Sequence, residues 1–424
     1  MGKGRAEDRS MTVASDIILT EFTPTLLDRH ALEMEEGEAI YNRFNGKIEI
    51  DFPSPRTQGR WRLRSLGWVG LIPLSGSRRL VLAPKTPLGN LFRMLEYTYQ
   101  LQSFELHKGT VESSSLDDLY QRLAAILAQR VLDRSRKGFH RAYVPESDRL
   151  PYLRGTLDIE QSIRAPWGVD LHCHYQEHTS DITENQILAW TLSVIARQQI
   201  CTGEKLEAVR AAYRSLQGFA TLRPFRTSDC VGRQYNRLTE DYQPLHSLCR
   251  FFLEHSGPTH ESGDRQMLPF MVNMNRLYEL FVAEWLRPNL PRGFRLTAQE
   301  KVVLGPTDQL RLNIDLVLSD AETESTLAVL DTKYKKQKAP SPSDLNQIVA
   351  YAVATNCRQG VLIYPVAPER PFNGSFGAGH INVRTMMFEL DGDLELNGRR
   401  FLEQLEAAFA LMNVIATPQK KNEA

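Results

Sequence analysis

The spacing of hydrophobic residues changes along the chain and predicts different structures for its beginning and its middle. Up to about residue 84, short apolar runs at 47–52, 61–66 and 80–83 are separated by Pro, Gly and Ser. Such short runs between turn residues are typical of β-strands. We therefore expect a small β-rich region at the start of the chain.

From residue 88 the apolar residues recur every three to four positions. This spacing extends over residues 88–101 and again over 116–132, and it predicts amphipathic α-helices because such positions share one helix face. Two more helices are expected over residues 183–200 and 204–216. The middle of the chain is therefore predicted to be mainly helical.

The last part of the chain alternates between the two patterns. A helix is expected at 273–286, followed by strands at 300–304, 309–318 and 326–332, a helix at 345–354 and a strand at 360–364. The order helix, three strands, helix, strand indicates a mixed α/β domain. The segment 257–265 is rich in Gly, Pro and polar residues, which makes it the best candidate linker.

These patterns predict a multidomain chain of mixed α+β or α/β class. We place a β-rich N-terminal domain at residues 1–88, a mainly helical region at 89–262 and the mixed domain at 263–415. Residues 1–10 are polar, and we expect them to be disordered.

Composition excludes several classes of protein. The 424 residues carry 51 Lys+Arg and 51 Asp+Glu, and a net charge of zero does not suit a protein that coats nucleic acid by bulk charge. No apolar run approaches the roughly 18–20 residues that cross a bilayer, so no membrane partner is expected. The five cysteines are scattered and odd in number, which favours free thiols in a reducing cytoplasm.

The lysines are unevenly distributed. The chain has only 13, and four of them lie within six residues, at Lys333, Lys335, Lys336 and Lys338. Local positive charge is therefore concentrated directly after one predicted strand.

That strand carries the candidate chemistry. Asp331-Thr332-Lys333 ends an apolar run, and strand alternation places Asp331 and Lys333 on one face. A short polar turn joins this strand to the preceding one, so Asp315 can approach Asp331 across the hairpin. Two carboxylates suit Mg²⁺, which takes one or two protein carboxylates and completes its shell with water and phosphate oxygens. Lys333 can then orient or deprotonate a water, or offset charge on a phosphate.

The triplet alone is a weak signal. Chance gives roughly one or two Asp/Glu-x-Lys triplets in a chain of this composition, and the alternative reading is a solvated strand end with an ion pair. Two further features favour a site. Gln347 and Tyr351 stand one helical turn apart, and Glu279 is a carboxylate among apolar residues of a predicted helix.

These residues resemble those of known nucleases. An Asp followed by Asp-x-Lys on a helix, hairpin, helix and strand resembles the PD-(D/E)xK superfamily, and Gln-x-x-x-Tyr resembles its RecB-like branch. Four segments resemble, more narrowly, the McrC family, the nuclease subunit of the McrBC modification-dependent restriction system. They are NLFRMLEY at 90–97, LPYLRG at 150–155, NRLYELF at 275–281, and LDTKY at 330–334 followed by DLNQ at 344–347.

The resemblance implies a Mg²⁺-dependent endonuclease that cuts double-stranded DNA containing methylcytosine. It implies Asp315 and Asp331 as metal ligands, Lys333 at the attacking water, and Gln347, Tyr351 and Glu279 as further catalytic residues. The implied partner is a McrB-like AAA+ GTPase ring, with residues 1–88 docking on it and stimulating its turnover. Two positions depart from the superfamily pattern: Ile314 stands where a Pro precedes the first Asp, and the triplet begins with Asp instead of Glu.

Other motifs have structural explanations. His172, Cys173, His174 and His178 could bind zinc, but the sequence around them alternates like a strand, which favours a structural role. Gly374-x-x-Gly377-x-Gly379 lacks the strand and helix of a dinucleotide site, and no GxxxxGK[ST] occurs. A partner would have to supply any nucleotide hydrolysis.

A second basic stretch lies within the predicted helical region. Arg134, Arg136, Lys137, His140 and Arg141 are interleaved with Phe139 and Tyr143, a mixture that suits contact with a phosphate backbone. Solubilising surface charge explains it equally well. The lysines after Asp331 are better candidates for DNA contact because they adjoin the proposed metal site.

Two other functions remain open from the sequence. The chain could be a catalytically silent scaffold or regulatory subunit of an AAA+ complex, or a stand-alone RecB-like exonuclease that works without an NTPase. An intact Asp315, Asp331 and Lys333 set argues against the scaffold.

Overall fold

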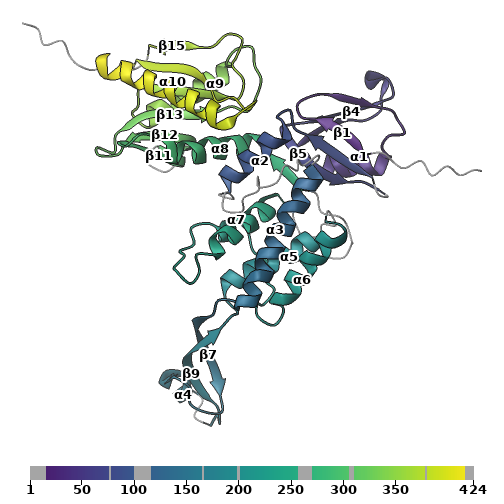
Figure 1. Cartoon of the computed structure of the whole chain (residues 1–424), viewed down its shortest axis with the longest axis vertical. Coiled ribbons are helices and arrows are strands. Elements are labelled where there is room, and N and C mark those ends of the chain that lie inside the picture. Colours follow the sequence, from purple (N-terminus) through teal and green to yellow (C-terminus); the bar gives the residue numbers. More distant parts are fainter. Residues whose placement is uncertain are drawn as a thin grey trace, which may run out of the picture. The chain divides into compact units, whose positions relative to one another are not determined.

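The computed structural model describes residues 16–75, 78–99, 116–164, 167–197, 201–255, 270–304, 310–377 and 380–415 (Figure 1). The chain forms two compact units. Unit 1 comprises Met1–Thr98 and Met271–Ala424, and unit 2 is Tyr99–Phe270. Helices and several separate sheets occur together, so the predicted mixed α and β class is confirmed. The proposed linker at 257–265 and the polar residues 1–10 lie outside the described residues.

The N-terminal part of unit 1 contains two small sheets. The first has the order β1-β6-β5-β10 and the second β2-β4-β3. The predicted β-rich character is confirmed, and the bounds are β1 Ile17–Thr20, β2 Thr25–Leu27, β3 Ile48–Asp51, β4 Trp61–Ser65, β5 Trp68–Pro73, β6 Arg79–Ala83 and β10 Phe270–Asn273. Strand β10 comes from far along the sequence, and its pairing with β5 ties this part to the C-terminal part of the same unit.

A helix that the hydrophobic pattern did not predict lies among these strands. Helix α1, Met34–Arg43, buries only Glu36, Gly37 and Ile40, too few apolar residues for a helical period. Its position depends on tertiary contacts instead. Glu36 forms a buried ion pair with Arg78 at 2.8 Å, and Gly37 leaves room for the ring of Trp61, which a Cβ would overlap.

The C-terminal part of unit 1 is a six-stranded sheet of order β11-β12-β13-β14-β16-β15 with helices α8, α9 and α10. The predicted order helix, three strands, helix, strand is confirmed by α8 Met274–Asn289, β11 Phe294–Leu304, β12 Leu310–Asp320, β13 Thr326–Thr332, α9 Pro342–Ala354 and β14 Gln359–Tyr364. Strands β15 Asn373–Phe376 and β16 Ile381–Met387 and helix α10 Leu394–Ile415 follow. Strands β13 and β14 are parallel, which requires the crossover that α9 provides.

Local chemistry fixes the two helices nearest the candidate site. The Asn273 side chain accepts hydrogen bonds from the backbone N–H groups of Asn275 and Arg276 and caps α8. Ser341 and Asp344 form a capping box at the start of α9. Both helices therefore begin at defined residues beside the sheet.

Helix α10 packs against α8 through a glycine. A Cβ on Gly398 would overlap the fully buried ring of Trp285. We expect Gly398→Ala to lower the free energy of unfolding by about 1–3 kcal/mol, the usual cost of overpacking. The matched control is Gly89→Ala in helix α2, Leu88–Thr98, where nothing lies within 4 Å of the new Cβ. That variant should be neutral or up to about 1 kcal/mol more stable. Urea unfolding compares the two, and equal midpoints would contradict this packing.

Unit 2 is a helical bundle with a β-hairpin extension (Figure 1). Its helices are α3 Leu116–Lys137, α5 Thr183–Arg197, α6 Gly203–Leu216 and α7 Tyr242–His255. The helices expected at 116–132, 183–200 and 204–216 are confirmed over their described residues, while α7 was not predicted. Helix α3 runs one turn further than expected and therefore carries Arg134 and Lys137 in its last turn.

The extension of unit 2 pairs β7, Ala142–Leu150, with β9, Leu171–Thr179. The short β8, Thr156–Leu157, and helix α4, Ile159–Arg164, lie at its far end. Across the described residues, no helix has the length and apolar character needed to cross a membrane.

Candidate active site at the end of strand β13

Strands β12 and β13 bring the two predicted aspartates to one place. The strands pair antiparallel, and Leu316 stands opposite Leu330. Asp315 and Asp331 are the next residues on each strand. Val317 lies two residues from Asp315 on β12, and Val329 lies two residues from Asp331 on β13. Both valines lie in the core beneath helix α9, so alternation places both aspartates on the face that α9 covers.

Thr332 fixes the orientation of Asp315. Its backbone N–H and its hydroxyl both donate to Asp315 Oδ2, at 2.9 and 3.0 Å. No sequence pattern indicates this role of Thr332, because alternation along one strand says nothing about a carboxylate on the neighbouring strand. This clamp holds one carboxylate edge of Asp315 still.

Asp331 is buried with one oxygen unpaired. The residue is 1 % exposed, and Oδ1 has no hydrogen-bond partner among the described residues. Burial and the nearby Asp315 carboxylate together raise the pKa of Asp331 to about 7, against the lowering effect of Lys333. An ionised carboxylate in such a position needs a compensating cation.

Lys333 supplies part of that compensation. Its Nζ lies 2.6 Å from Asp331 Oδ2, which confirms that the two side chains share a strand face. Burial acts to lower the pKa of Lys333, but the carboxylates of Asp331 and Asp315 outweigh it, and the net direction is upward. Lys333 is therefore held in its charged form.

Helix α9 holds the lysine from the other side. Lys333 Nζ donates to Gln347 Oε1 at 2.9 Å, and Gln347 Nε2 donates to the Tyr351 hydroxyl at 2.6 Å. The predicted common face of Gln347 and Tyr351 is confirmed. Lys333, Gln347 and Tyr351 thus form one continuous hydrogen-bonded chain ending at a mostly buried ring.

Glu279 on α8 belongs to the same electrostatic cluster. Burial and the Asp315 carboxylate raise the pKa of Glu279 to about 7, against the opposing effect of Arg276. Arg276 Nη1 and Gln299 Nε2 both donate to Glu279 Oε1 at 2.8 Å. The structure therefore brings together all six residues that the sequence analysis singled out.

Gln299 is a second residue that the sequence did not indicate. It interrupts the pairing of β11 with β12 at the position opposite Asp315, between the pairs Ala298–Leu316 and Glu300–Ile314. Its φ of 56° lies in the left-handed region, which is costly for a residue with a side chain. The irregularity turns its amide toward Glu279. An exposed polar residue in a strand gives no sequence signal for this.

The cluster has the donors that a magnesium ion needs. In the part of the chain that the structure describes, no three His, Cys, Asp or Glu residues gather closely enough to form an all-protein metal site. Mg²⁺ does not require one, because it keeps several waters and uses one or two carboxylates. The unpaired Oδ1 of Asp331 beside Asp315 fits that requirement.

A buried network joins this strand to the N-terminal sheets of unit 1. The hydroxyl of Tyr334, the residue after Lys333, donates to Glu21 Oε1 at 2.7 Å and lies 3.1 Å from the Thr86 hydroxyl. Glu21 is fully buried, burial raises its pKa, and its Oε1 also accepts from the Lys85 backbone N–H. The chain after Lys333 is thereby anchored on residues more than 240 positions away.

We expect Tyr334→Phe to destabilise unit 1. The change removes a buried hydroxyl and leaves Glu21 with fewer donors, which costs about 1–3 kcal/mol. Tyr41→Phe is the matched control, since Tyr41 is 52 % exposed. The midpoint of urea unfolding should fall for Tyr334→Phe and stay unchanged for Tyr41→Phe. Identical midpoints for the two would contradict the anchoring role.

The histidine-rich segment forms a strand with local partners. Cys173 is fully buried on β9, and its neighbours point elsewhere: His172 Nε2 accepts from Arg149 Nε at 2.8 Å, and His174 Nε2 lies 3.1 Å from Asp158 Oδ2. The predicted strand is confirmed, and each side chain has a structural role there.

Comparison with known proteins gives consistent matches. The family model described as McrBC 5-methylcytosine restriction system component matches residues 63–365. The type IV methyl-directed restriction enzyme EcoKMcrBC of Escherichia coli (strain K12) is 25% identical over 271 residues, 60% of this chain and 74% of that protein. A chain of the refined half-complex from the tetradecameric assembly of Thermococcus gammatolerans McrB AAA+ hexamers with bound McrC is similar in fold. It has a TM-score of 0.52 at 18% identity and covers 92% of this chain and 100% of that chain.

Proposed function

Because the chain belongs to the McrBC 5-methylcytosine restriction system component family, we propose that it is the subunit that cuts DNA in a two-part restriction complex. The observation that carries the proposal is Asp331: it is buried, one of its oxygens is unpaired, and the other is paired with a charged lysine. Lys333 compensates only one of the two oxygens, and an ionised carboxylate is costly to bury while its other oxygen has no partner. Family membership and this geometry point to phosphodiester hydrolysis.

Each residue of the cluster has a proposed role in catalysis. Asp315 and Asp331 would hold Mg²⁺, which would lower the pKa of a bound water and offset charge on the phosphate. Lys333 stays protonated, so it stabilises the negative charge that develops on the phosphate and orients the water. Gln347 and Tyr351 hold Lys333 in place. Glu279, with a pKa of about 7, is suited to accept a proton from the water.

The fold around these residues supports the same proposal. The order of α8, β11, β12, β13, α9 and β14 resembles the helix, hairpin, helix and strand arrangement of PD-(D/E)xK nucleases. We assign residues 263–415 to that superfamily as part of the proposal.

The partner that we propose is a McrB-like AAA+ ring. The Thermococcus gammatolerans chain of similar fold is bound to McrB AAA+ hexamers, and this chain lacks a GxxxxGK[ST] nucleotide motif of its own. A partner ring would therefore bind the nucleotide and recognise the modified base. Docking through residues 1–88 remains an expectation from the family resemblance.

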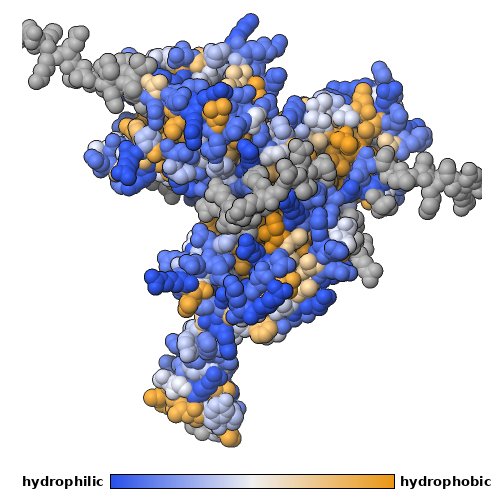
Figure 2. Space-filling view, viewed as in Figure 1, coloured by the Kyte–Doolittle hydropathy of each residue, from blue (hydrophilic) through white to orange (hydrophobic). Residues whose placement is uncertain are grey.

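The hairpin extension of unit 2 offers a concrete surface for that partner. Large apolar side chains at its far end are exposed: Ile159 by 64%, Ile163 by 69%, Trp167 by 84% and Val169 by 90%. Figure 2 shows hydrophobic residues gathered at this tip. An exposed apolar patch of this kind marks an interaction site, and we propose that it contacts the ring.

We expect the double variant Ile163→Ser/Trp167→Ser to lose most of its stimulation of the partner's GTPase. Truncating a hot-spot residue, a class in which Trp is enriched, costs about 2 kcal/mol of binding or more, which is about thirtyfold in affinity. Leu396→Ser on α10, 50% exposed, is the control and should stimulate normally. A double variant that stimulates as well as the wild type would place the docking surface elsewhere.

A circular plasmid tests the proposed activity. The complex of this chain with its ring partner, supplied with Mg²⁺ and GTP, should linearise methylated plasmid and leave unmethylated plasmid intact. A circular substrate has no ends, so linearisation separates an endonuclease from a RecB-like exonuclease. GTP turnover without any cut would support the scaffold function instead.

A further inference from the structure

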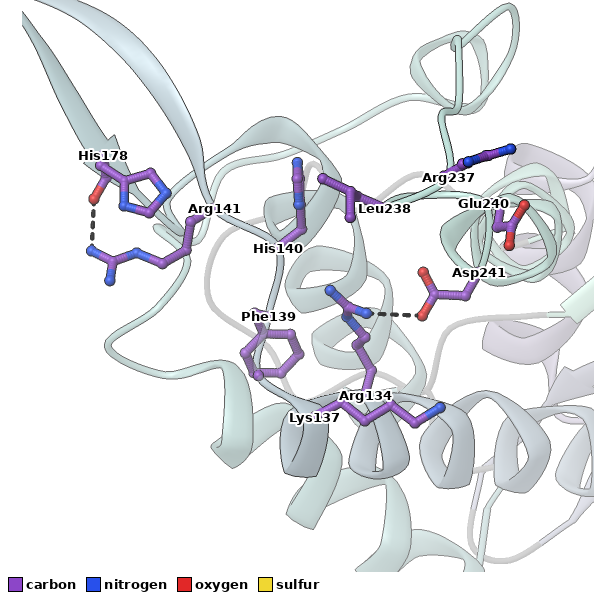
Figure 3. Close-up of a pocket in the computed structure, with 11 residues that line it drawn as sticks. Arg134, Lys137, Phe139, His140, Arg141, His178, Arg237, Leu238, Glu240 and Asp241 are labelled. Carbon is purple, nitrogen blue, oxygen red and sulfur yellow. Dashed lines mark hydrogen bonds and ion pairs between the residues drawn. The ribbon is translucent and has the colours of Figure 1, made fainter.

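Unit 2 contains a basic hollow of about 580 Å³ (Figure 3). It lies between the last turn of α3, the segment leading into β7, the end of β9 and the loop before α7. Its charged walls are Arg134, Lys137, Arg141, Arg237, Glu240 and Asp241. The first three belong to the basic stretch that the sequence left undecided between surface charge and phosphate contact.

Pairing within the hollow leaves an excess of positive charge. Arg134 Nη1 lies 3.1 Å from Asp241 Oδ2, so these two charges offset each other. Arg141 donates to the neutral backbone carbonyl of His178 at 2.6 Å and keeps its charge. Figure 3 shows both contacts as dashed lines. Among the described residues, Lys137 and Arg237 have neither a hydrogen-bond nor an ion-pair partner, and Glu240 is the remaining acid of the wall.

The walls are also held in place. The Arg134 guanidinium lies over the Tyr242 ring, 5.2 Å from its centroid, and the side chain is only 17% exposed. The Tyr242 hydroxyl accepts from the His140 backbone N–H at 3.0 Å. The hollow is therefore a formed feature of the bundle, unlike a set of solvated side chains on one helix face.

An aromatic side chain next to the hollow indicates which anion it would bind. Tyr143 is 68% exposed, and its ring centroid lies 4.9 Å from that of His178 on the facing strand. Arg141 immediately precedes β7, and Tyr143 is the second residue of that strand. Both side chains lie against His178, Arg141 at its carbonyl and Tyr143 at its ring. Cations beside an exposed flat ring suit a nucleic-acid strand, whose phosphates pair with the cations and whose bases stack on the ring. An acidic peptide has no need of the ring.

We propose that the basic hollow is a second DNA-binding site, separate from the acidic cluster of β13. Lys137, Arg141 and Arg237 contact backbone phosphates, and Tyr143 contacts an exposed base. Arg134 and Asp241 shape the wall between them. This inference rests on the proposed function in one respect, that DNA is the substrate of the complex.

The test measures DNA binding without catalysis. Fluorescein-labelled DNA of about 20 nucleotides, single-stranded or duplex, is titrated with the full chain in low salt without Mg²⁺ or GTP, and anisotropy gives the affinity. Lys137→Gln/Arg237→Gln should bind roughly tenfold more weakly, and the slope of log K against log salt should fall by about two for duplex DNA. Arg210→Gln/Arg214→Gln on helix α6, exposed and equal in charge change, is the control and should bind as the wild type does.

Tyr143→Leu tests the aromatic contact. It should lower the affinity for single-stranded DNA by about tenfold and the affinity for duplex DNA much less, since stacking needs an unpaired base. If Lys137→Gln/Arg237→Gln binds DNA with the affinity of the wild type, the inference is overturned. A double variant that keeps DNA affinity but loses GTPase stimulation would also overturn it, because the hollow would then face the protein partner.

The outcomes separate this inference from the proposed function. If the wild type shows no DNA binding alone, the same comparison is made with the assembled complex, and no difference there overturns the inference. If the complex cuts plasmid but Lys137→Gln/Arg237→Gln binds DNA normally, only the DNA-binding role of the basic hollow is refuted. A complex in which the hollow binds DNA and no cut ever occurs refutes only the nuclease.

Discussion

Lys333→Ala should reduce the rate of plasmid cleavage by the assembled complex by on the order of 10²–10³-fold, the usual cost of removing a group that stabilises transition-state charge. Its Nζ is held between Asp331 Oδ2 and Gln347 Oε1 at 2.6 and 2.9 Å, so the charge is already in place before the phosphate arrives. The loss should fall on the chemical step. Stimulation of the partner's GTPase should remain, because Lys333 lies in the acidic cluster and contributes nothing to the hairpin tip.

The matched control is Lys336→Ala. Lys336 is exposed and lies three residues after Lys333. Its substitution removes one positive charge from the same basic run. A contact to the DNA backbone would make this variant salt-sensitive with little change in rate at low salt. If both variants cleave equally well, Lys333 has no chemical role and the proposed division of work is wrong.

Asp331→Asn should separate metal binding from folding. We expect Mg²⁺ at several times its dissociation constant to stabilise the wild type by on the order of 1 kcal/mol and to leave the variant unchanged. Without metal, the variant should unfold at no lower denaturant concentration than the wild type above pH 7. Burial raises the pKa of Asp331 to about 7, so its ionised form opposes folding above that pH, and asparagine carries no charge.

Denaturant unfolding of both proteins, with and without Mg²⁺, checks this expectation. Asp320→Asn serves as control, since Asp320 ends β12 at the polar turn before β13, whereas Asp331 lies near the other end of β13. A variant that is stabilised by Mg²⁺ as much as the wild type would show that Asp331 is not a ligand. A variant that fails to fold without metal would show that Asp331 is structural.

The chemistry of the site was largely predictable because its residues follow from short-range rules. Strand β13 was predicted with its observed bounds, since an apolar run ends there at charged residues. Strand alternation then placed Asp331 and Lys333 together. Helical spacing placed Gln347 and Tyr351 on one face, and the hairpin brought Asp315 to the triplet.

The supporting contacts could not be predicted because they join residues that no local pattern relates. Thr332 and Gln299 act on carboxylates of other elements, and the contact of Tyr334 with Glu21 spans more than 300 residues. The inclusion of β10 in the first sheet is of the same kind. Each depends on how distant strands meet, which hydrophobic periodicity does not encode.

Missed helices have other physical causes. Helix α1 has too few apolar residues to show a period, and its position depends on the Glu36–Arg78 ion pair and on Gly37 beneath Trp61. Helix α7 contains Pro244 near its start, a position where proline is compatible with a helix but weakens a helical prediction. Local signals and tertiary contacts thus disagree at both places, and the tertiary contacts decide.

The central claim is that the acidic cluster of this chain makes the cut. The most direct test is one reaction in which the ring partner is wild type and only this chain carries Asp331→Asn. Supercoiled methylated plasmid, Mg²⁺ and GTP are supplied, and plasmid form and GTP turnover are measured together. We predict that GTP turnover continues while the plasmid stays supercoiled. Linearisation at the wild-type rate would contradict the claim and place the nuclease elsewhere.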